Sequence, residues 1–147
     1  MTPPQGKNIL FAGVGGQGVL LVAELSARVA IHAGFDAKKT EVHGVAQRGG
    51  SVVSHVRFGS RVYSPLIPAG EVDILLALEM LEGLRWAHYV RDGGRIVLNS
   101  EERAPARFDS NPIEYPKEID LFLKGKGFAV QVLDATSIAG ELGNYRA

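Results

Sequence analysis

Two short stretches of the chain combine residue types that could bind a ligand or take part in a reaction. The first is GVGGQG at residues 13–18, which matches the G-x-G-x-x-G pattern between a buried apolar run and an amphipathic segment. Glycines at this spacing let backbone N–H groups approach a phosphate at a helix N-terminus. The pattern indicates a ligand- or phosphate-binding loop, with candidate residues Gly13, Gly15, Gly16, Gln17 and Gly18. The same glycines would also suit a turn that only packs a helix closely on a sheet, so both interpretations stand.

The second stretch is EVHGVAQRGGSVVSHVRFG at residues 41–59, which joins two strand-like runs through a polar, glycine-containing loop. Arg48 lies beside two glycines and could bind an anion, because exposed backbone amides next to a guanidinium form an anion-binding concavity. Glu41 stands roughly where a dinucleotide fold places the acid that binds ribose. The candidate residues of this stretch are Glu41, His43, Gln47, Arg48, Gly49, Gly50, Ser51 and His55.

The same stretch argues against a hydrolytic triad and against a metal centre. Ser54 and His55 are adjacent on a predicted strand, so their side chains point to opposite faces. Two histidines without a pattern of nearby carboxylates make a weak metal site. From the residues alone we expect an anion-binding or partner-binding loop, with no metal and no catalytic residue in this chain.

Composition narrows the classes of function. The chain has 147 residues, no cysteine, and 16 basic residues against 16 acidic ones. Without cysteine it can hold no disulfide, no thiolate nucleophile and no Cys-ligated zinc or iron–sulfur cluster. The balanced charge and an aromatic content of 7% argue against nucleic acid as a partner. No apolar run reaches the ~20 residues that span a bilayer, and no signal-peptide pattern is present, so we expect a cytoplasmic protein that does not bind membranes.

The candidate loops lie between alternating strand-like and helix-like segments. This alternation predicts one α/β domain over residues 1–147, a three-layer sandwich with a Rossmann-like, mostly parallel sheet and an antiparallel hairpin. Residues 101–117 have no clear period and are expected to be irregular. Strands are expected at 7–12, 36–42, 51–59, 61–64, 72–79, 95–100 and 128–135, and helices at 19–34, 80–91, 117–125 and 136–143.

Four local expectations are specific enough to test. In the helix at 19–34, helical spacing places Leu21, Leu25, Val29 and Ala33 on one apolar face. The strands at 51–59 and 61–64 are expected to pair as the antiparallel hairpin around a Gly-Ser turn. Asp92-Gly93-Gly94 is expected to be a turn, and Asp134 or Thr136 to cap the last helix.

ILFAGVGGQGVLL, EVHGVAQRGGSVVSHVRFG and SPLIPAGEVDILLALE together resemble the gamma subunit, or gamma domain, of the 2-oxoacid:ferredoxin oxidoreductases. Within that group the chain is most similar to the small beta subunit of the indolepyruvate ferredoxin oxidoreductases. The resemblance covers most of the chain and is most specific at 13–19 and 41–57. A combined motif of this length is far more specific than a lone glycine fingerprint.

The resemblance implies a division of labour within a complex. A large partner subunit would carry thiamine diphosphate, Mg and iron–sulfur clusters, decarboxylate the 2-oxoacid and pass electrons to ferredoxin, with coenzyme A taking the acyl group. This chain would bind no cofactor itself and would be inactive alone. Its loop at 41–55 would meet the partner, its cofactor or coenzyme A through residues such as His43, Gln47 and Arg48.

Members of this family usually run on after a segment like GELGNYRA, whereas this chain stops at Ala147. A natural short form and a truncated chain both remain open, and a missing element would leave apolar area exposed. Two other functions also remain open: a stand-alone nucleotide-dependent oxidoreductase, and a noncatalytic scaffold relative. The residues do not identify the 2-oxoacid.

Overall fold

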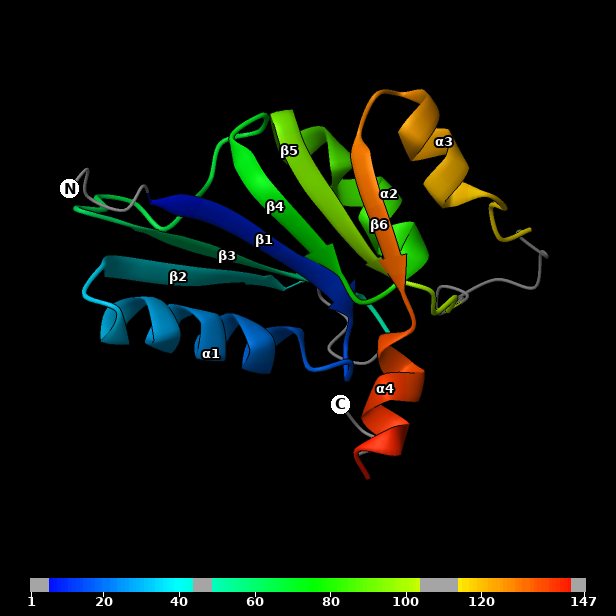
Figure 1. Cartoon of the computed structure of the whole chain (residues 1–147), viewed down its shortest axis with the longest axis horizontal. Helices are drawn as coiled ribbons and strands as arrows, with labels where there is room; N and C mark the ends of the chain where they lie inside the picture. The colour runs from blue at the N-terminus through cyan, green and yellow to red at the C-terminus, as the bar shows by residue number, and fades with distance from the viewer. Residues whose placement is uncertain (1–5, 44–48, 104–113, 144–147) are drawn as a thin grey trace.

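A six-stranded sheet forms the centre of the computed structural model, which describes residues 6–43, 49–103 and 114–143 (Figure 1). The strand order is β2-β3-β1-β4-β5-β6. The pairs β1–β4, β4–β5 and β5–β6 are parallel, while β3 runs antiparallel to both β1 and β2. The strands are β1 (Lys7–Val14), β2 (Asp36–His43), β3 (Ser51–Gly59), β4 (Val72–Ala77), β5 (Val90–Asn99) and β6 (Ala129–Leu133).

Helices cover both faces of this sheet, which confirms the predicted α/β architecture. In Figure 1, α1 lies along β2 on one side, whereas α2 and α3 lie at the other end of the sheet. α4 extends away from the carboxyl end of β6. The helices are α1 (Val19–His32), α2 (Met80–Trp86), the 3₁₀ turn η1 (Ala87–Tyr89), α3 (Ile119–Gly125) and α4 (Ala135–Glu141). Asp134 caps α4 as predicted, because its Oδ1 accepts a hydrogen bond from Ser137 N at 2.9 Å.

Two apolar clusters separate the layers, and alternate residues of β1 feed them in turn. Phe11 packs with residues of α1 and β3, including Ala23 and Val56. Leu10 packs on the opposite face, among residues of β4, β5, α2 and α3 such as Leu75 and Ile119. This alternation follows from the two-residue period of a strand, so β1 is buried on both faces at the middle of the sheet.

The apolar face predicted for α1 is not the face that packs against the sheet. Leu21, Leu25 and Val29 are exposed, with more than half of each side chain's reference area in solvent. The buried face is instead made of small residues: Val19, Ala23, Ala27 and Ala30. Alanine lets the helix axis approach the sheet closely, and helical spacing alone does not say which of two apolar stripes turns inward.

The predicted hairpin between 51–59 and 61–64 is also wrong. Residues 61–64 form no strand, because β3 already pairs with β1 along one edge and with β2 along the other. The antiparallel partners of β3 are therefore β1 and β2.

The expected turn at 92–94 lies inside β5 instead, where Gly93 has φ +73°. The pairing with β4 shifts there from Val72–Val90 to Ile74–Arg95, which is a bulge in β5 rather than a chain reversal.

Candidate functional site at the carboxyl edge of the sheet

The glycine loop follows β1 at the edge of the sheet where β1, β4, β5 and β6 all end. Gly13 has no room for a side chain, since an added Cβ would lie 2.8 Å from Val19 Cγ2 and 2.9 Å from Gln17 Oε1. Gly16 and Gly18 have space around them but adopt φ +96° and +85°, which other residues rarely do. Gly18 is the N-cap of α1. The loop is therefore a turn whose backbone conformation requires glycine at several positions.

The two motifs of the sequence meet in this loop. Gly15 N donates a hydrogen bond to Gly50 O at 2.9 Å, and Val14 pairs with Ser51 where β1 lies against β3. Gly49, with φ +77°, belongs to the same connection. The glycine loop and residues 49–51 of the 41–59 stretch are therefore one structural unit.

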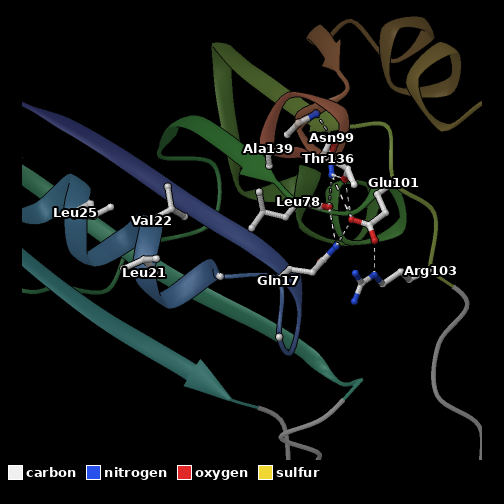
Figure 2. Close-up of a pocket in the computed structure, with 13 residues that line it drawn as sticks. Gln17, Leu21, Val22, Leu25, Leu78, Asn99, Glu101, Arg103, Thr136 and Ala139 are labelled. Atoms are coloured by element: carbon white, nitrogen blue, oxygen red, sulfur yellow. Dashed lines mark hydrogen bonds and ion pairs between the residues drawn. The ribbon is translucent and has the colours of Figure 1, made fainter. Parts of the chain in front are cut away.

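Gln17 joins this unit to the neighbouring strands (Figure 2). Its Oε1 accepts from Val14 N at 2.7 Å, and its Nε2 donates to Leu78 O at 3.0 Å and to Glu101 Oε2 at 3.1 Å. The side chain is only 8% exposed. Gln17 thus uses both its donor and acceptor groups to hold the end of β1 against the residues that follow β4 and β5.

Glu101 is the charged centre of this arrangement. Its carboxylate accepts from Gln17 and Thr136 and makes an ion pair with Arg103, while Asn99 Nδ2 donates to Thr136 Oγ1 at 3.2 Å (Figure 2). A cavity of about 330 Å³ lies beside them, between α1 and α4, with Leu21, Val22 and Leu25 on the α1 side.

This cavity offers little to a phosphate. The backbone N–H of Gly15 is bonded to Gly50 O, and that of Gln17 to Val14 O. Glu101 and Arg103 both line the cavity and pair with each other, so the lining offers an anion no unpaired cation. The local chemistry therefore favours the view that the glycines serve a structural turn.

Ser51 is hydrogen-bonded to a second set of buried polar groups, which lies at the start of α2. Its hydroxyl donates a short hydrogen bond to Glu82, which also pairs with Arg85 at 3.1 Å. Glu79, 1% exposed, accepts from Glu82 N at 2.9 Å, from Arg103 N at 3.0 Å and from the Tyr115 hydroxyl.

Burial and the hydrogen bond to Glu79 raise the pKa of Tyr115, so this phenol remains a protonated donor. Arg103 bonds to both Glu79 and Glu101 and so connects the two sets of groups. We call the combined set the edge network; it consists of Gln17, Ser51, Glu79, Glu82, Asn99, Glu101, Arg103, Tyr115 and Thr136.

Glu41 and His43 lie on β2, away from this cavity. Glu41 pairs with Lys39 at 2.7 Å, and Lys39 also pairs with Glu24 of α1 at 3.1 Å. β3 lies between β2 and β1, so Glu41 is two strands from the glycine loop rather than on the adjacent strand of a dinucleotide fold. His43 is the last residue of β2. Gln47 and Arg48 lie outside the described residues.

His55 is separated from the other candidates. It lies in the middle of β3, four residues and about 13 Å along the strand from Ser51. The side chain is 3% exposed, its Nδ1 accepts from Ile67 N at 3.2 Å, and its ring meets that of Tyr89 edge to face. Burial lowers the pKa of His55. The structure thus brings together Gly15, Gln17, Gly50 and Ser51, and places His55 elsewhere.

Sequence reasoning missed the buried acids and Asn99 of the edge network. A signal for them was present, because Glu79 and Asn99 each stand at the end of a strand-like apolar run. Side chains at the carboxyl ends of parallel strands gather at one edge of a sheet, where α/β proteins place their binding sites. Among the residues that the structure describes, no group of three or more His, Cys, Asp or Glu could hold a metal ion.

No helix in the described ranges is long and apolar enough to cross a membrane.

Comparison with known proteins gives a consistent family. Residues 8–147 match the family model described as pyruvate ferredoxin/flavodoxin oxidoreductase. Indolepyruvate oxidoreductase subunit IorB of Thermococcus kodakarensis is 38% identical over 143 residues, which cover 93% of this chain and 69% of that protein. The subunit of the same name in Archaeoglobus fulgidus is 37% identical over 142 residues, covering 95% of this chain and 70% of that protein. The common gamma subunit of the pyruvate/ketoisovalerate oxidoreductases of Thermococcus kodakarensis is 26% identical over 136 residues, covering 91% of this chain and 67% of that protein.

Solved structures share the fold. Pyruvate oxidoreductase subunit PORC of Thermotoga maritima superposes with a TM-score of 0.68 at 20% identity, covering 97% of this chain and 70% of that chain. The 2-oxoglutarate:ferredoxin oxidoreductase of Magnetococcus marinus gives a TM-score of 0.67 at 20% identity, covering 97% of this chain and 22% of that longer chain. The same fold therefore occurs in a small separate chain and within a larger one.

Proposed function

Because the chain belongs to the pyruvate ferredoxin/flavodoxin oxidoreductase family, we propose that it is the small, gamma-type subunit of a 2-oxoacid:ferredoxin oxidoreductase complex. The observation that carries the proposal is the 38% identity to an IorB subunit over 93% of the chain. In this proposal residues 1–147 form one gamma-type domain. The complex oxidatively decarboxylates a 2-oxoacid to an acyl-CoA, and the isolated chain is inactive.

The chemistry of the chain supports a partner that holds the cofactors. Iron–sulfur clusters need thiolate ligands, and the chain has no cysteine. In the proposed complex a large subunit supplies thiamine diphosphate, Mg and the iron–sulfur clusters. Coenzyme A is the co-substrate and ferredoxin takes the electrons through the complex.

The substrate that we propose is an aryl 2-oxoacid. The support is similarity alone, since the relatives at 34–38% identity are named indolepyruvate oxidoreductase subunits. The 26% identity to a pyruvate/ketoisovalerate subunit is weaker. Substrate choice can also lie on the large subunit, so turnover of several 2-oxoacids has to be compared in the assembled complex.

We propose that the stretch around Arg48 contacts the large subunit, its cofactor or coenzyme A. The support is the position of the residues next to it: Gly50 is bonded to the glycine loop and Ser51 to Glu82 of α2. The residues that follow Arg48 are thus bonded to the rest of the domain, and the proposal assigns the contact with the partner to His43, Gln47 and Arg48.

The test is to tag the chain in its native cell, isolate it anaerobically and identify the co-purifying chains by mass spectrometry. We expect a brown complex that contains a large thiamine- and iron–sulfur-binding chain. Arg48→Ala should leave the isolated chain folded but reduce assembly or turnover, whereas Arg95→Ala, at an exposed site on β5, should change neither. A colourless lone protein would overturn the subunit proposal, and normal turnover with Arg48→Ala would overturn the role of the loop.

A stand-alone nucleotide-dependent oxidoreductase is the alternative that the glycine pattern raised. It requires Glu41 to bind ribose, yet Glu41 pairs with Lys39. It also requires free loop amides, two of which are already bonded. Binding of NAD(P) or FAD to the purified chain would favour this alternative over the subunit proposal.

A further inference from the structure

A second cavity, of about 500 Å³, lies against the opposite face of β3 from α1. We call it the His55 pocket; its principal lining residues are His55, Arg57, Leu66, Ile67, Trp86 and Tyr89. Its volume is within the usual range for sites that bind small molecules. None of its lining residues belongs to the edge network, so it is a separate feature of the molecule.

Arg57 brings a positive charge to this pocket without a matching negative one. Its Nε donates to Asn8 Oδ1 at 3.0 Å, and its Nη1 donates to the carbonyl oxygens of Ser64 and Leu66 at 3.3 and 2.9 Å. All of these acceptors are neutral. By contrast, Arg91 pairs with Asp73 and Arg103 with Glu101. A partly buried guanidinium without a carboxylate among the described residues favours an anionic ligand.

His55 adds a second donor on the same wall. Its Nδ1 accepts a hydrogen bond from the backbone, so the neutral ring carries its proton on Nε2. Burial lowers the pKa of His55, which keeps the ring neutral. Within the described part of the chain, the only hydrogen bond of the His55 ring is the one from Ile67 N to Nδ1.

The remaining walls are aromatic and aliphatic. The rings of Trp86 and Tyr89 lie 5.3 Å apart between centroids, and the chain segment with Leu66 and Ile67 closes another side. The Trp86 indole N–H is buried without an acceptor among the described residues. The pocket lining contains no Asp or Glu, so the pocket has donors and apolar surface but no acid.

We propose that the His55 pocket binds a small aromatic carboxylate; the choice of an aromatic acid rests on the aryl 2-oxoacid of the proposed function. The carboxylate lies at Arg57 and His55, and the ring lies against Trp86 and Tyr89. This arrangement supplies the missing negative charge and covers the apolar walls. The cavity between α1 and α4 suits such a ligand less well, because Arg103, the cation that lines it, is already paired with Glu101.

Calorimetric titration of the full chain tests the proposal, with phenylacetate and phenylpyruvate as probes and phenylacetamide as the neutral control. We expect saturable binding of both acids, and binding at least about tenfold weaker for the amide, because a charge-assisted hydrogen bond is lost. The chain has a single tryptophan, so a change in fluorescence of Trp86 on binding places the ligand in this pocket. If phenylpyruvate binds more tightly than phenylacetate, the ligand is an aryl 2-oxoacid. If the two acids bind equally, the pocket accepts aryl carboxylates in general.

Two variants and one control complete the test. Arg57→Gln should weaken phenylacetate binding at least about tenfold, whereas Arg95→Gln should leave it unchanged. Arg57 also donates hydrogen bonds to Ser64 O and Leu66 O, so a second variant is needed that leaves these bonds in place. Val42→Phe covers this case, because Val42 is 45% exposed and lines the pocket, and a larger ring there should block binding in a folded chain. No saturable binding of either acid up to the millimolar range, or equal binding of acid and amide, would overturn the proposal.

Discussion

The edge network and the His55 pocket differ in how their polar groups are satisfied. In the edge network, buried carboxylates and amides bond to each other, as Gln17, Glu101 and Asn99 do around Leu78 O. In the His55 pocket, the charged group bonds only to neutral acceptors, and the indole N–H of Trp86 has no acceptor among the described residues. A cavity lies beside each region, but the polar groups of the edge network are paired with one another, whereas donors of the His55 pocket are not paired with acids.

This difference suggests what each region does. A polar network with every member bonded stabilises one arrangement of the chain, and its removal should appear as lost folding stability. Unmatched donors next to an apolar cavity leave binding capacity for a ligand. The glycine motif that suggests a ligand site in the sequence therefore belongs to the region best explained by stability.

The largest effect on stability is expected for Glu79→Ala. Glu79 accepts three hydrogen bonds at 1% exposure, so its removal leaves buried donors without an acceptor. We expect the free energy of unfolding to fall by about 3 kcal/mol or more, measured by urea denaturation. Glu71→Ala, at an exposed loop position, should change it by less than about 0.5 kcal/mol. An equally small loss of stability in both variants would show that the edge network does not stabilise the fold more than an exposed loop does.

The next effect is expected for Gln17→Leu, which keeps the size of the side chain but removes its hydrogen bonds. Val14 N and Leu78 O each lose a partner, so stability should fall by about 2 kcal/mol. Gln131→Leu, on the exposed surface of β6, is the matched control. If Gln17→Leu were as stable as the parent and lost a ligand instead, the glycine loop would have to be considered a binding site.

A smaller effect should depend on pH and come from the His55 pocket. Because burial lowers the pKa of His55 below 6.5 in the folded chain, the unfolded chain takes up a proton first as pH falls. Stability should therefore decrease below pH 6.5, by at most about 1.4 kcal/mol per pH unit, until the folded pKa is passed. His55→Asn keeps an acceptor for Ile67 N and should remove this part of the slope. His32→Asn, on an exposed histidine, should preserve it; identical slopes in the parent and both variants would contradict the assignment.

The smallest effect is expected for Lys39→Ala, outside both regions. Lys39 pairs with Glu41 and Glu24 near the surface, and such pairs contribute less than about 1 kcal/mol. The loss should shrink further at high salt because the charges are screened. A loss comparable with that of Gln17→Leu would show that the β2–α1 contact is a third stabilising region.

The order of elements could be predicted from the sequence, but some packing choices could not. Strand and helix periods identified β1, α1, β4 and α3 to within a few residues. The buried face of α1 could not be chosen, because a stripe of leucines competed with a stripe of alanines and only contact with the sheet distinguishes them. The predicted strand at 61–64 failed for a similar reason: a local turn signal does not reveal that both edges of β3 are already occupied.

The candidate site could be predicted only in part, because local pattern is visible in the sequence and contacts between distant strands are not. Local pattern identified the glycine-rich positions that include Gly13, which has no room for a side chain, and Gly18 and Gly49, which adopt positive φ. It could not show that Gly15 bonds to Gly50, since that contact depends on the register of β1 with β3. The acids Glu79, Glu82 and Glu101 were invisible as a group because they come together only when β4 and β5 end at the same edge.

The central position of β1 has a consequence for how the chain folds. Phe11 pairs with Ser54 on one side and with Leu76 on the other, so both neighbours of the first strand are synthesised long after it. Pairings so distant in sequence fold slowly. Until β3 and β4 arrive, β1 is an apolar strand with two open edges, which is the form most prone to pair with another chain. A nascent or refolding chain should therefore be most vulnerable to aggregation through residues 7–14, and slower synthesis beyond residue 14 should lengthen that period.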